Sequence, residues 1–397
     1  MSSFANDLTQ RLEALRQQGL HRELRRVNSA CGPSIELGGQ TLLSFGSNDY
    51  LGLAAHPALR EAAIRAVERF GAGAGASRLI CGSLAPFHEL EDALAAFKRT
   101  EAALVFATGY AAALGTITAL LGKGDLIILD KLVHACIVDA ARLSGAKLRV
   151  FAHNDLNDLE AKLKWADSLS RAKDAVTRRT LVVTESIFSM DGDAAPLREI
   201  VTLKHRYGAW LMVDEAHATG VLGPSGRGLA DALGVSSQIE IQMGTLGKAL
   251  GASGGFICGS RLLIEFLVNR ARSFIFSTAP VPAAAAAALA GLSVAHSSEG
   301  DTRRLTLRGL VADLHRQIGL PGLTAPAAIT PIIIGHESQA VAAAAALREQ
   351  GFFVPAIRYP TVARGSARLR LSLTAAHQPA DVAALTRALP AIIHQPS

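Results

Sequence analysis

Two short polar segments hold the residues with the clearest catalytic potential, and each follows an apolar run. Asp214 and His217 come directly after the run 209–213, and Lys248 stands in the segment Gly-Thr-Leu-Gly-Lys after the run 239–243. A lysine among glycines has the space to condense with an aldehyde and form a planar imine. A carboxylate at the end of a buried strand can keep a heteroaromatic nitrogen protonated, so that the ring accepts electrons. The combination predicts covalent catalysis on an aldehyde-bearing ring.

A phosphate on the same ring would find hydrogen-bond donors in two places. Thr245 stands three residues before Lys248, and Gly109-Tyr110 joins an apolar run to a helical stretch. The first N–H groups of a helix have no intrahelical partner, and the helix dipole favours an anion there. A nucleotide P-loop is excluded around Lys248, because the spacing is GxxGK and Ala249 replaces the required Ser or Thr.

Single residues near these segments have two interpretations each. His134 follows the apolar run 126–129 and could stack on the ring, although an isolated histidine is more often an ordinary packed residue. Ser189 precedes an Asp-Gly turn and could contact the ring or simply serve that turn. Without Lys248, Asp214 would most simply cap the turn after its strand. These residues gain a catalytic interpretation only as a set.

The elements that must position these residues follow an alternating pattern. From residue 57 onward, helical stretches separate short runs that are apolar on both faces, which is typical of a mostly parallel sheet covered on both sides. Ligands bind at the carboxyl edge of such sheets, and the polar segments described above all follow strands. The predicted strands are 104–107, 125–129, 147–151, 180–184, 209–213, 239–243 and 255–258, and the predicted helices include 57–70, 85–99 and 111–121.

The pattern changes along the chain indicate three parts. Residues 1–45 are expected to form an N-terminal arm with an amphipathic helix over 8–24. Residues 46–285 are expected to form a large α/β domain, and residues 286–397 a smaller α+β domain. A chain of 397 residues is long enough for two such cores.

The bulk composition favours a cytoplasmic enzyme. Four dispersed cysteines without a CxxC pair argue against a zinc site or a disulfide framework and for a reducing compartment. The N-terminus lacks a secretory pattern, and no apolar run is long enough to span a membrane. The basic residues behind the net charge of +6 are dispersed and are not interleaved with aromatic residues, so nucleic acid is not an expected partner.

As a set, the motifs resemble the α-oxoamine synthases, a family of fold-type-I pyridoxal 5′-phosphate enzymes. The matching segments are Ser-Asn-Asp-Tyr-Leu-Gly-Leu at 47–53, Ser-Met-Asp-Gly-Asp at 189–193, Asp-Glu-Ala-His at 214–217 and Gly-Thr-Leu-Gly-Lys at 244–248, in the family's order. The resemblance extends from the arm to residue 377. It implies decarboxylative condensation of an amino acid with an acyl thioester, in a homodimer with active sites between subunits.

The resemblance also implies roles for individual residues. Lys248 would carry the cofactor as a Schiff base and act as general base, and Asp214 would pair with the pyridine nitrogen. The other cofactor contacts would be His217 and Ser189 at the phenolic oxygen, His134 on the ring face, Gly109, Tyr110 and Thr245 at the phosphate, and Thr278 at the neighbouring subunit's cofactor. The substrate contacts would be Asn48 and Arg368 at the amino-acid carboxylate, Thr361 beside the acyl chain, and Arg22 at its far end, where Arg25 and Arg26 are alternatives.

Three stretches, at 149–155, 210–214 and 356–377, are most similar to the branch of the family that joins L-alanine to a pimeloyl thioester in biotin biosynthesis. Ala363 departs from that pattern, which often has proline there. The sequence leaves open whether coenzyme A or an acyl carrier protein bears the pimeloyl group. The alternatives are branches that use glycine or serine, an aminotransferase on the same fold, and a ligand-sensing regulator. A regulator would need a DNA-binding segment, and none is evident before residue 40.

Overall fold

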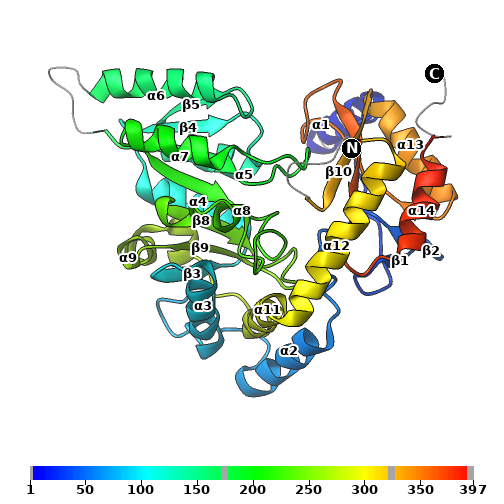
Figure 1. The fold of residues 1–397 in the computed structure, drawn as a ribbon, viewed down its shortest axis with the longest axis horizontal. Helices are drawn as coiled ribbons and strands as arrows, with labels where there is room; N and C mark the ends of the chain where they lie inside the picture. Colours follow the sequence, from blue (N-terminus) through cyan, green and yellow to red (C-terminus); the bar gives the residue numbers. More distant parts are fainter. Residues whose placement is uncertain (1–2, 171–177, 321–326, 391–397) are drawn as a thin grey trace.

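The larger part of the molecule is built on a seven-stranded sheet with the order β3-β9-β8-β7-β6-β4-β5 (Figure 1). The computed structural model describes residues 3–170, 178–320 and 327–390. All neighbouring strands are parallel except that β9 runs antiparallel to both β3 and β8, which confirms the mostly parallel sheet expected from the sequence. The strands are β3 (Ala102–Phe106), β4 (Leu126–Asp130), β5 (Lys147–Phe151), β6 (Thr180–Glu185), β7 (Trp210–Asp214), β8 (Ile241–Thr245) and β9 (Gly255–Gly259).

Helices cover both faces of this sheet. Successive side chains of a strand point to opposite faces, and here both faces are apolar, so each must be buried in its own core. On β4, Leu126 and Ile128 belong to one core, whereas Ile127 and Leu129 belong to the other. Helices α3, α6, α7 and α11 contribute to the first core, and α4, α5 and α9 to the second. The helices of this part are α2 (Pro57–Phe70), α3 (Ala85–Lys98), α4 (Gly109–Leu120), α5 (Ala135–Ser144), α6 (Leu156–Ser170), α7 (Leu197–Arg206), α8 (Leu229–Ala232), α9 (Arg261–Arg270), α10 (Arg272–Ile275) and α11 (Pro282–Ala295). Among the described helices, none combines the length and the apolar character needed to cross a membrane.

The smaller part joins segments from both ends of the chain. Its antiparallel sheet has the order β10-β13-β12, formed by β10 (Ile329–Gly335), β13 (Ala367–Ser372) and β12 (Ala356–Ile357). A second sheet consists of β1 (Ser34–Leu37), β2 (Gln40–Ser44) and β11 (Phe352–Phe353). Helix α12 (Ser298–Gln317) runs between the two parts, and α13 (Glu337–Glu349) and α14 (Pro379–Ala388) complete the smaller one (Figure 1).

These pairings differ from both expected domain boundaries. Strands β1 and β2 lie within the predicted arm of residues 1–45, yet β2 pairs with β11 near the opposite end of the chain. The predicted boundary at residue 285 falls inside α11, which packs against α2 and α3 of the larger part. Residues on both sides of position 285 therefore belong to one helix packed against the larger part. We propose that the boundary lies in the connection between α11 and α12.

The N-terminal helix is shorter than expected. Helix α1 covers Ser3–Gln17 instead of 8–24, and none of its residues is buried. Gly19 adopts a left-handed backbone with φ of 65°, a conformation that favours glycine and follows the end of many helices. The chain after it is held by the smaller part, since Arg22 donates to the Tyr359 carbonyl at 3.0 Å. Tertiary contacts thus order the second half of the expected helix.

A buried ion pair between Lys98 and Glu215 links the end of α3 to the loop that follows the central strand β7. Lys98 is the last residue of α3, and Glu215 directly follows β7; their side chains are 1% and 0% exposed. Glu215 also accepts from the Ala230 N–H at 2.9 Å, and Lys98 donates to the Arg227 carbonyl at 2.5 Å. The pair therefore anchors the segment that follows β7.

Replacing Lys98 by methionine should lower the free energy of unfolding by about 3–5 kcal/mol, because Glu215 would keep an uncompensated buried charge. Urea denaturation of the two proteins measures the difference. K162M is the matched control, since Lys162 pairs with Asp158 on a partly exposed helix face, where such pairs contribute about 0–1 kcal/mol. Equal losses in the two variants would contradict this account.

Candidate active site

The residues predicted to do chemistry lie together at the carboxyl edge of the parallel strands. Asp214 is the last residue of β7, and Lys248 lies in the loop after β8. The Lys248 Nζ is 2.7 Å from the His217 Nε2, and the Nδ1 of His217 is 2.6 Å from the Tyr50 hydroxyl. Asp214 and His217 are buried, with exposed fractions of 4% and 5%. An amine, a carboxylate and an imidazole thus share one region from which water is largely excluded.

Burial determines the protonation preferences of this cluster. It lowers the pKa of Lys248, whereas the charges of Asp214 and Glu185 oppose that shift. It raises the pKa of Asp214, which the charge of Lys248 opposes. It also lowers the pKa of His217 well below the usual range, and the charges of Lys248 and Arg370 add to the effect. A lysine with a lowered pKa is more often unprotonated near neutral pH and is therefore a better nucleophile and base.

Glu185 was not among the predicted site residues, although its carboxylate holds the backbone of two of them. It ends β6 opposite Asp214 in the strand register and is 2% exposed. Its carboxylate accepts from the backbone N–H groups of His134 at 2.6 Å and Ser189 at 3.2 Å. Burial and the charge of Asp214 raise the pKa of Glu185 to about 8. The available signal was its place at the end of an apolar run, which it shares with Asp214.

The expected phosphate-binding segment has the geometry of an anion site. Gly109 and Tyr110 are the first residues of α4, and the hydroxyl of Thr108 caps that helix. A Cβ at Gly255 would lie 2.5 Å from the Gly109 Cα, so β9 passes very close to the start of the helix. Gly255 pairs with Thr245 across β8 and β9. Gly255 therefore links the start of α4 to Thr245, and the contact of these residues with a phosphate stays a prediction.

The structure favours a different arginine of β13 for the substrate carboxylate. Arg368 was expected beside Asn48, but it donates to the Asp191 carboxylate at 2.5 Å and to the Met190 carbonyl at 3.1 Å. Arg370 instead donates to the side-chain oxygen of Asn48 at 3.2 Å. Residues two apart lie on the same face of a strand, so the sequence pattern alone does not separate these two arginines.

Comparisons with known proteins identify the family of this chain. The family model for aminotransferase class I and II matches residues 40–389. An 8-amino-7-oxononanoate synthase from Anaeromyxobacter dehalogenans (strain 2CP-1 / ATCC BAA-258) is 51% identical over 385 residues, which is 96% of this chain and 94% of the relative. One from Herminiimonas arsenicoxydans is 49% identical over 97% of this chain and 98% of the relative. The chain belongs to the aminotransferase class I and II family, among its 8-amino-7-oxononanoate synthases.

Solved structures of this family share the fold. Serine palmitoyltransferase from S. paucimobilis, solved with a bound PLP-myriocin aldimine, has a TM-score of 0.89 and 31% identity, covering 98% of this chain and 97% of that one. An 8-amino-7-oxononanoate synthase from Francisella tularensis has a TM-score of 0.73 and 28% identity, covering 89% of this chain and 97% of that one. The expected fold class, a fold-type-I transferase with a larger and a smaller part, is confirmed.

The other expected contacts lie outside the Lys248 cluster. Arg22 reaches the Tyr359 carbonyl, two residues before Thr361, which is exposed. Thr278 is also exposed, and its backbone forms an isolated antiparallel bridge with Ser77. The roles of Arg22, Thr361 and Thr278 toward a substrate or a second subunit stay predictions.

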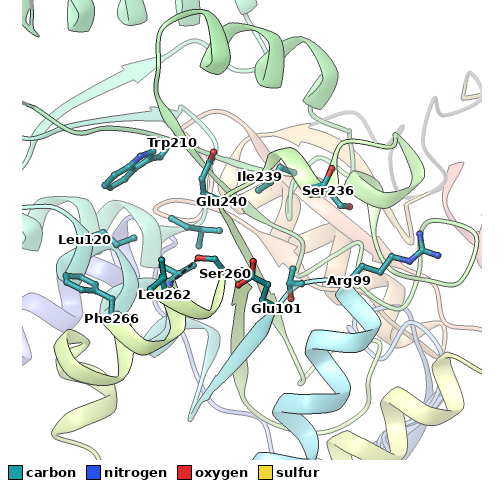
Figure 2. Close-up of a pocket in the computed structure, with 15 residues that line it drawn as sticks. Arg99, Glu101, Leu120, Trp210, Ser236, Ile239, Glu240, Ser260, Leu262 and Phe266 are labelled. Carbon is teal, nitrogen blue, oxygen red and sulfur yellow. Dashed lines mark hydrogen bonds between the residues drawn. The ribbon is translucent and has the colours of Figure 1, made fainter.

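A separate cavity lies at the amino ends of the parallel strands, whereas the candidate active site lies at their carboxyl ends. Its volume is about 710 Å³, and Figure 2 shows Trp210, Leu120 and Phe266 on one side of it, with Glu240 and Glu101 nearby. Trp210 is the first residue of β7, so the cavity adjoins the amino ends of the parallel strands. None of the predicted site residues lines it.

A histidine bridge fixes loops at the periphery of the site. The ring nitrogens of His153 lie 3.0 Å from an Asp130 oxygen and 2.8 Å from an Asp193 oxygen. Asp130 ends β4, and the Asp193 carbonyl accepts from the Phe188 N–H, next to Ser189. Burial alone would lower the pKa of His153, but its hydrogen bonds to the two carboxylates outweigh this effect and raise the pKa to about 10.

This raised pKa predicts a pH-dependent contribution to stability. Because the pKa of His153 in the folded state exceeds the ordinary value of 6.5, the charged bridge stabilises the fold fully below pH 6.5 and loses that effect as the pH rises toward about 10. H153Q should therefore be less stable than the wild type near pH 6 and approach it above pH 10 in urea denaturation. The control H205Q changes an exposed residue of α7. A pH-independent difference between H153Q and the wild type would contradict the prediction.

Proposed function

We propose that this chain is a pyridoxal-phosphate-dependent acyltransferase that joins L-alanine to a pimeloyl thioester in biotin biosynthesis. The products would be 8-amino-7-oxononanoate, carbon dioxide and a free thiol. The observation that carries the proposal is the buried contact of Lys248 with His217 next to Asp214, in a chain that is 51% and 49% identical to two enzymes of that name. Coenzyme A and an acyl carrier protein are the two candidate carriers of the pimeloyl group.

The donor set of the site fits pyridoxal phosphate. Lys248 supplies an amine for the aldehyde, and Asp214 supplies a buried carboxylate for the pyridine N–H. The start of α4 supplies N–H donors for the phosphate, and the Thr245 hydroxyl, which donates to the Gly254 carbonyl at 3.0 Å, would turn its proton toward the phosphate. When bound, the cofactor provides an electron-accepting ring joined to the substrate nitrogen. The contacts left for the ring are His217 and Ser189 at the phenolic oxygen and His134 on its face.

The chain's own residues would bind L-alanine and move a proton. Arg370 and Asn48 would bind the alanine carboxylate, because a guanidinium presents paired donors that match it. Lys248 would accept the α-proton as general base, since its lowered pKa keeps the amine available. In the overall reaction the α-carbon of alanine loses a proton and bonds to the thioester carbonyl carbon, the carbon–sulfur bond breaks, and the alanine carboxylate leaves as carbon dioxide. The α-carbon then regains a proton, and the released thiolate takes up another to become the free thiol.

A group of arginines supports an acyl chain that ends in a carboxylate. Burial lowers the pKa of Arg358, and the charges of Arg22 and Arg25 lower it further, so three positive charges influence one another here. The Nε of Arg358 is buried and has no hydrogen-bond partner among the described residues. The Thr361 N–H donates to the Arg358 carbonyl at 3.0 Å. A concentration of positive charge of this kind fits the far carboxylate of a pimeloyl chain.

We also propose a cytoplasmic homodimer with shared active sites. Leu79, Ile80 and Phe276 are exposed by 48%, 78% and 71%, and they flank the bridge between Ser77 and Thr278. Exposed apolar side chains that gather in this way favour burial by another protein surface. A second copy seated there would bring Thr278 toward its cofactor, as the family resemblance implies. Free cysteines fit a reducing compartment.

The proposed function requires Lys248. Cofactor-loaded protein mixed with L-alanine and pimeloyl-CoA should release coenzyme A and yield the amino ketone, identified by mass spectrometry. After borohydride reduction, the cofactor should stay on the peptide that contains Lys248, and K248A should lose both the attachment and turnover. K131A, which removes an exposed lysine near His134, should retain both. Pyruvate formed from alanine without thioester would indicate an aminotransferase instead, and preferred turnover of glycine or serine would indicate another branch.

The choice between the two arginines of β13 is also testable. R370K should raise the KM for L-alanine roughly 10-fold or more, because lysine lacks the paired donors of arginine and a hydrogen bond to a charged group contributes about 1.5–3 kcal/mol. R368K should change this KM much less, because Arg368 contacts the loop around Asp191. If R368K had the larger effect on KM, the carboxylate role would return to Arg368, as the family resemblance implied.

A further inference from the structure

Tyr50 has no role in the proposed chemistry so far, although it contacts the centre of the site. It is fully buried, with 0% exposed, and it belongs to the segment 47–53. The Asp49 carboxylate fixes that segment by accepting from the Leu53 N–H at 2.7 Å. The Tyr50 hydroxyl lies 2.6 Å from the His217 Nδ1, and the opposite ring nitrogen of His217 lies 2.7 Å from the Lys248 Nζ. Tyr50 is therefore linked to the lysine through one imidazole.

The hydroxyl of Tyr50 has a single proton to donate. Its neighbours are the His217 Nδ1, the Asn48 side-chain oxygen at 3.1 Å, and an Arg370 nitrogen at 3.4 Å, which only donates. The shortest of these distances is the one to Nδ1. Burial raises the pKa of Tyr50, so the hydroxyl keeps its proton, and the lowered pKa of His217 keeps the imidazole neutral. A neutral imidazole that accepts at Nδ1 carries its own proton at Nε2.

We propose that Tyr50 is a positioning residue that holds His217 as the Nε2–H tautomer, so that a donor faces Lys248 and any anionic oxygen bound beside it. The part of this inference that concerns bound cofactor rests on the proposed function, in which His217 donates to the phenolic oxygen. The part that concerns the tautomer does not. Arg370 donates to the Tyr50 oxygen and thereby strengthens the hydroxyl as a donor. The proposed carboxylate site is thus connected to His217.

The tautomer can be measured in protein without cofactor. In ¹⁵N-histidine-labelled protein, the ring-nitrogen signals that disappear in H217Q belong to His217. In the wild type we expect a protonated Nε2 and an unprotonated Nδ1. Y50F removes the donor to Nδ1 and should shift the tautomer ratio toward Nδ1–H by roughly threefold to tenfold, the equivalent of one net hydrogen bond. A wild-type His217 protonated at Nδ1, or a ratio unchanged in Y50F, would overturn the proposal.

A second measurement uses the absorption spectrum of the cofactor-loaded protein. A donor to the phenolic oxygen stabilises its anionic form, so weakening that donor should raise the pH midpoint of the visible absorption change by about 0.5–1 pH unit in Y50F. The charged and titratable groups around this pair are Lys248, Arg370 and His134 near His217, and Glu185 near Tyr50. The substitution changes none of them.

The matched control is Y207F, which also removes one phenolic hydroxyl. Tyr207 donates to Glu160 at 2.9 Å, at the end of α7, and has no contact with His217. A midpoint that moves in Y50F and stays unchanged in Y207F supports the proposal, and equal shifts in both variants would overturn it. If the wild-type protein bound no pyridoxal phosphate, the proposed function would fail, and the tautomer measurement would still decide the role of Tyr50.

Discussion

The active site depends on keeping three ionisable groups out of water at one edge of a sheet. Glu185 and Asp214 end adjacent parallel strands, and Lys248 lies close enough to alter the pKa of both. Two neighbouring buried carboxylates resist simultaneous ionisation, and a positive charge on Lys248 offsets that repulsion whenever the lysine is protonated, so the three protonation states are linked. Strands that are apolar on both faces, covered by helices on each side, exclude the water that would weaken these interactions. The apolar runs in the sequence therefore serve the chemistry as well as the core.

The loops around this edge are held from the ends of the strands. Glu185 accepts backbone N–H groups from the loops of both His134 and Ser189, and His153 joins Asp130 at the end of β4 to the turn that contains Asp193. Each bridge involves a charged or buried partner, and such hydrogen bonds are stronger than neutral, exposed ones. A ring that enters this region would meet side chains whose positions are already set, which reduces the entropy lost on binding.

Much of this arrangement follows from the sequence because its signals are local. Asp214 and Lys248 each follow an apolar run, and the carboxyl edge of a parallel sheet brings such positions together. The features that the sequence analysis missed depend on contacts between residues far apart in the chain, and local sequence patterns carry no information about such contacts. Strand β2 pairs with β11 near the far end of the chain. Arg368 and Arg370 share one face of β13. Tyr50 is fully buried and cannot be told from an ordinary aromatic core residue by its type alone. Only the three-dimensional register shows that Arg370, and not Arg368, lies beside Asn48. The end of α1, in contrast, has a local signal, because Gly19 takes a left-handed backbone and the Leu20 N–H donates back to the Leu15 carbonyl at 2.8 Å.

Strand β13 connects the two parts of the molecule at the point where substrate would bind. Arg368 donates to Asp191 and Arg370 to the Ser189 carbonyl, so a strand of the smaller part holds the loop that contacts the proposed cofactor. Arg370 also donates to Asn48 and Tyr50, on the segment that leads into the larger part. A carboxylate bound at Arg370 would compete for the same donors and so alter the contacts of Ser189 and Tyr50. Binding free energies at linked sites are reciprocal, so the state of the Lys248 cluster must in turn affect how tightly the amino acid is held. The relative placement of the two parts is therefore a component of the active site itself.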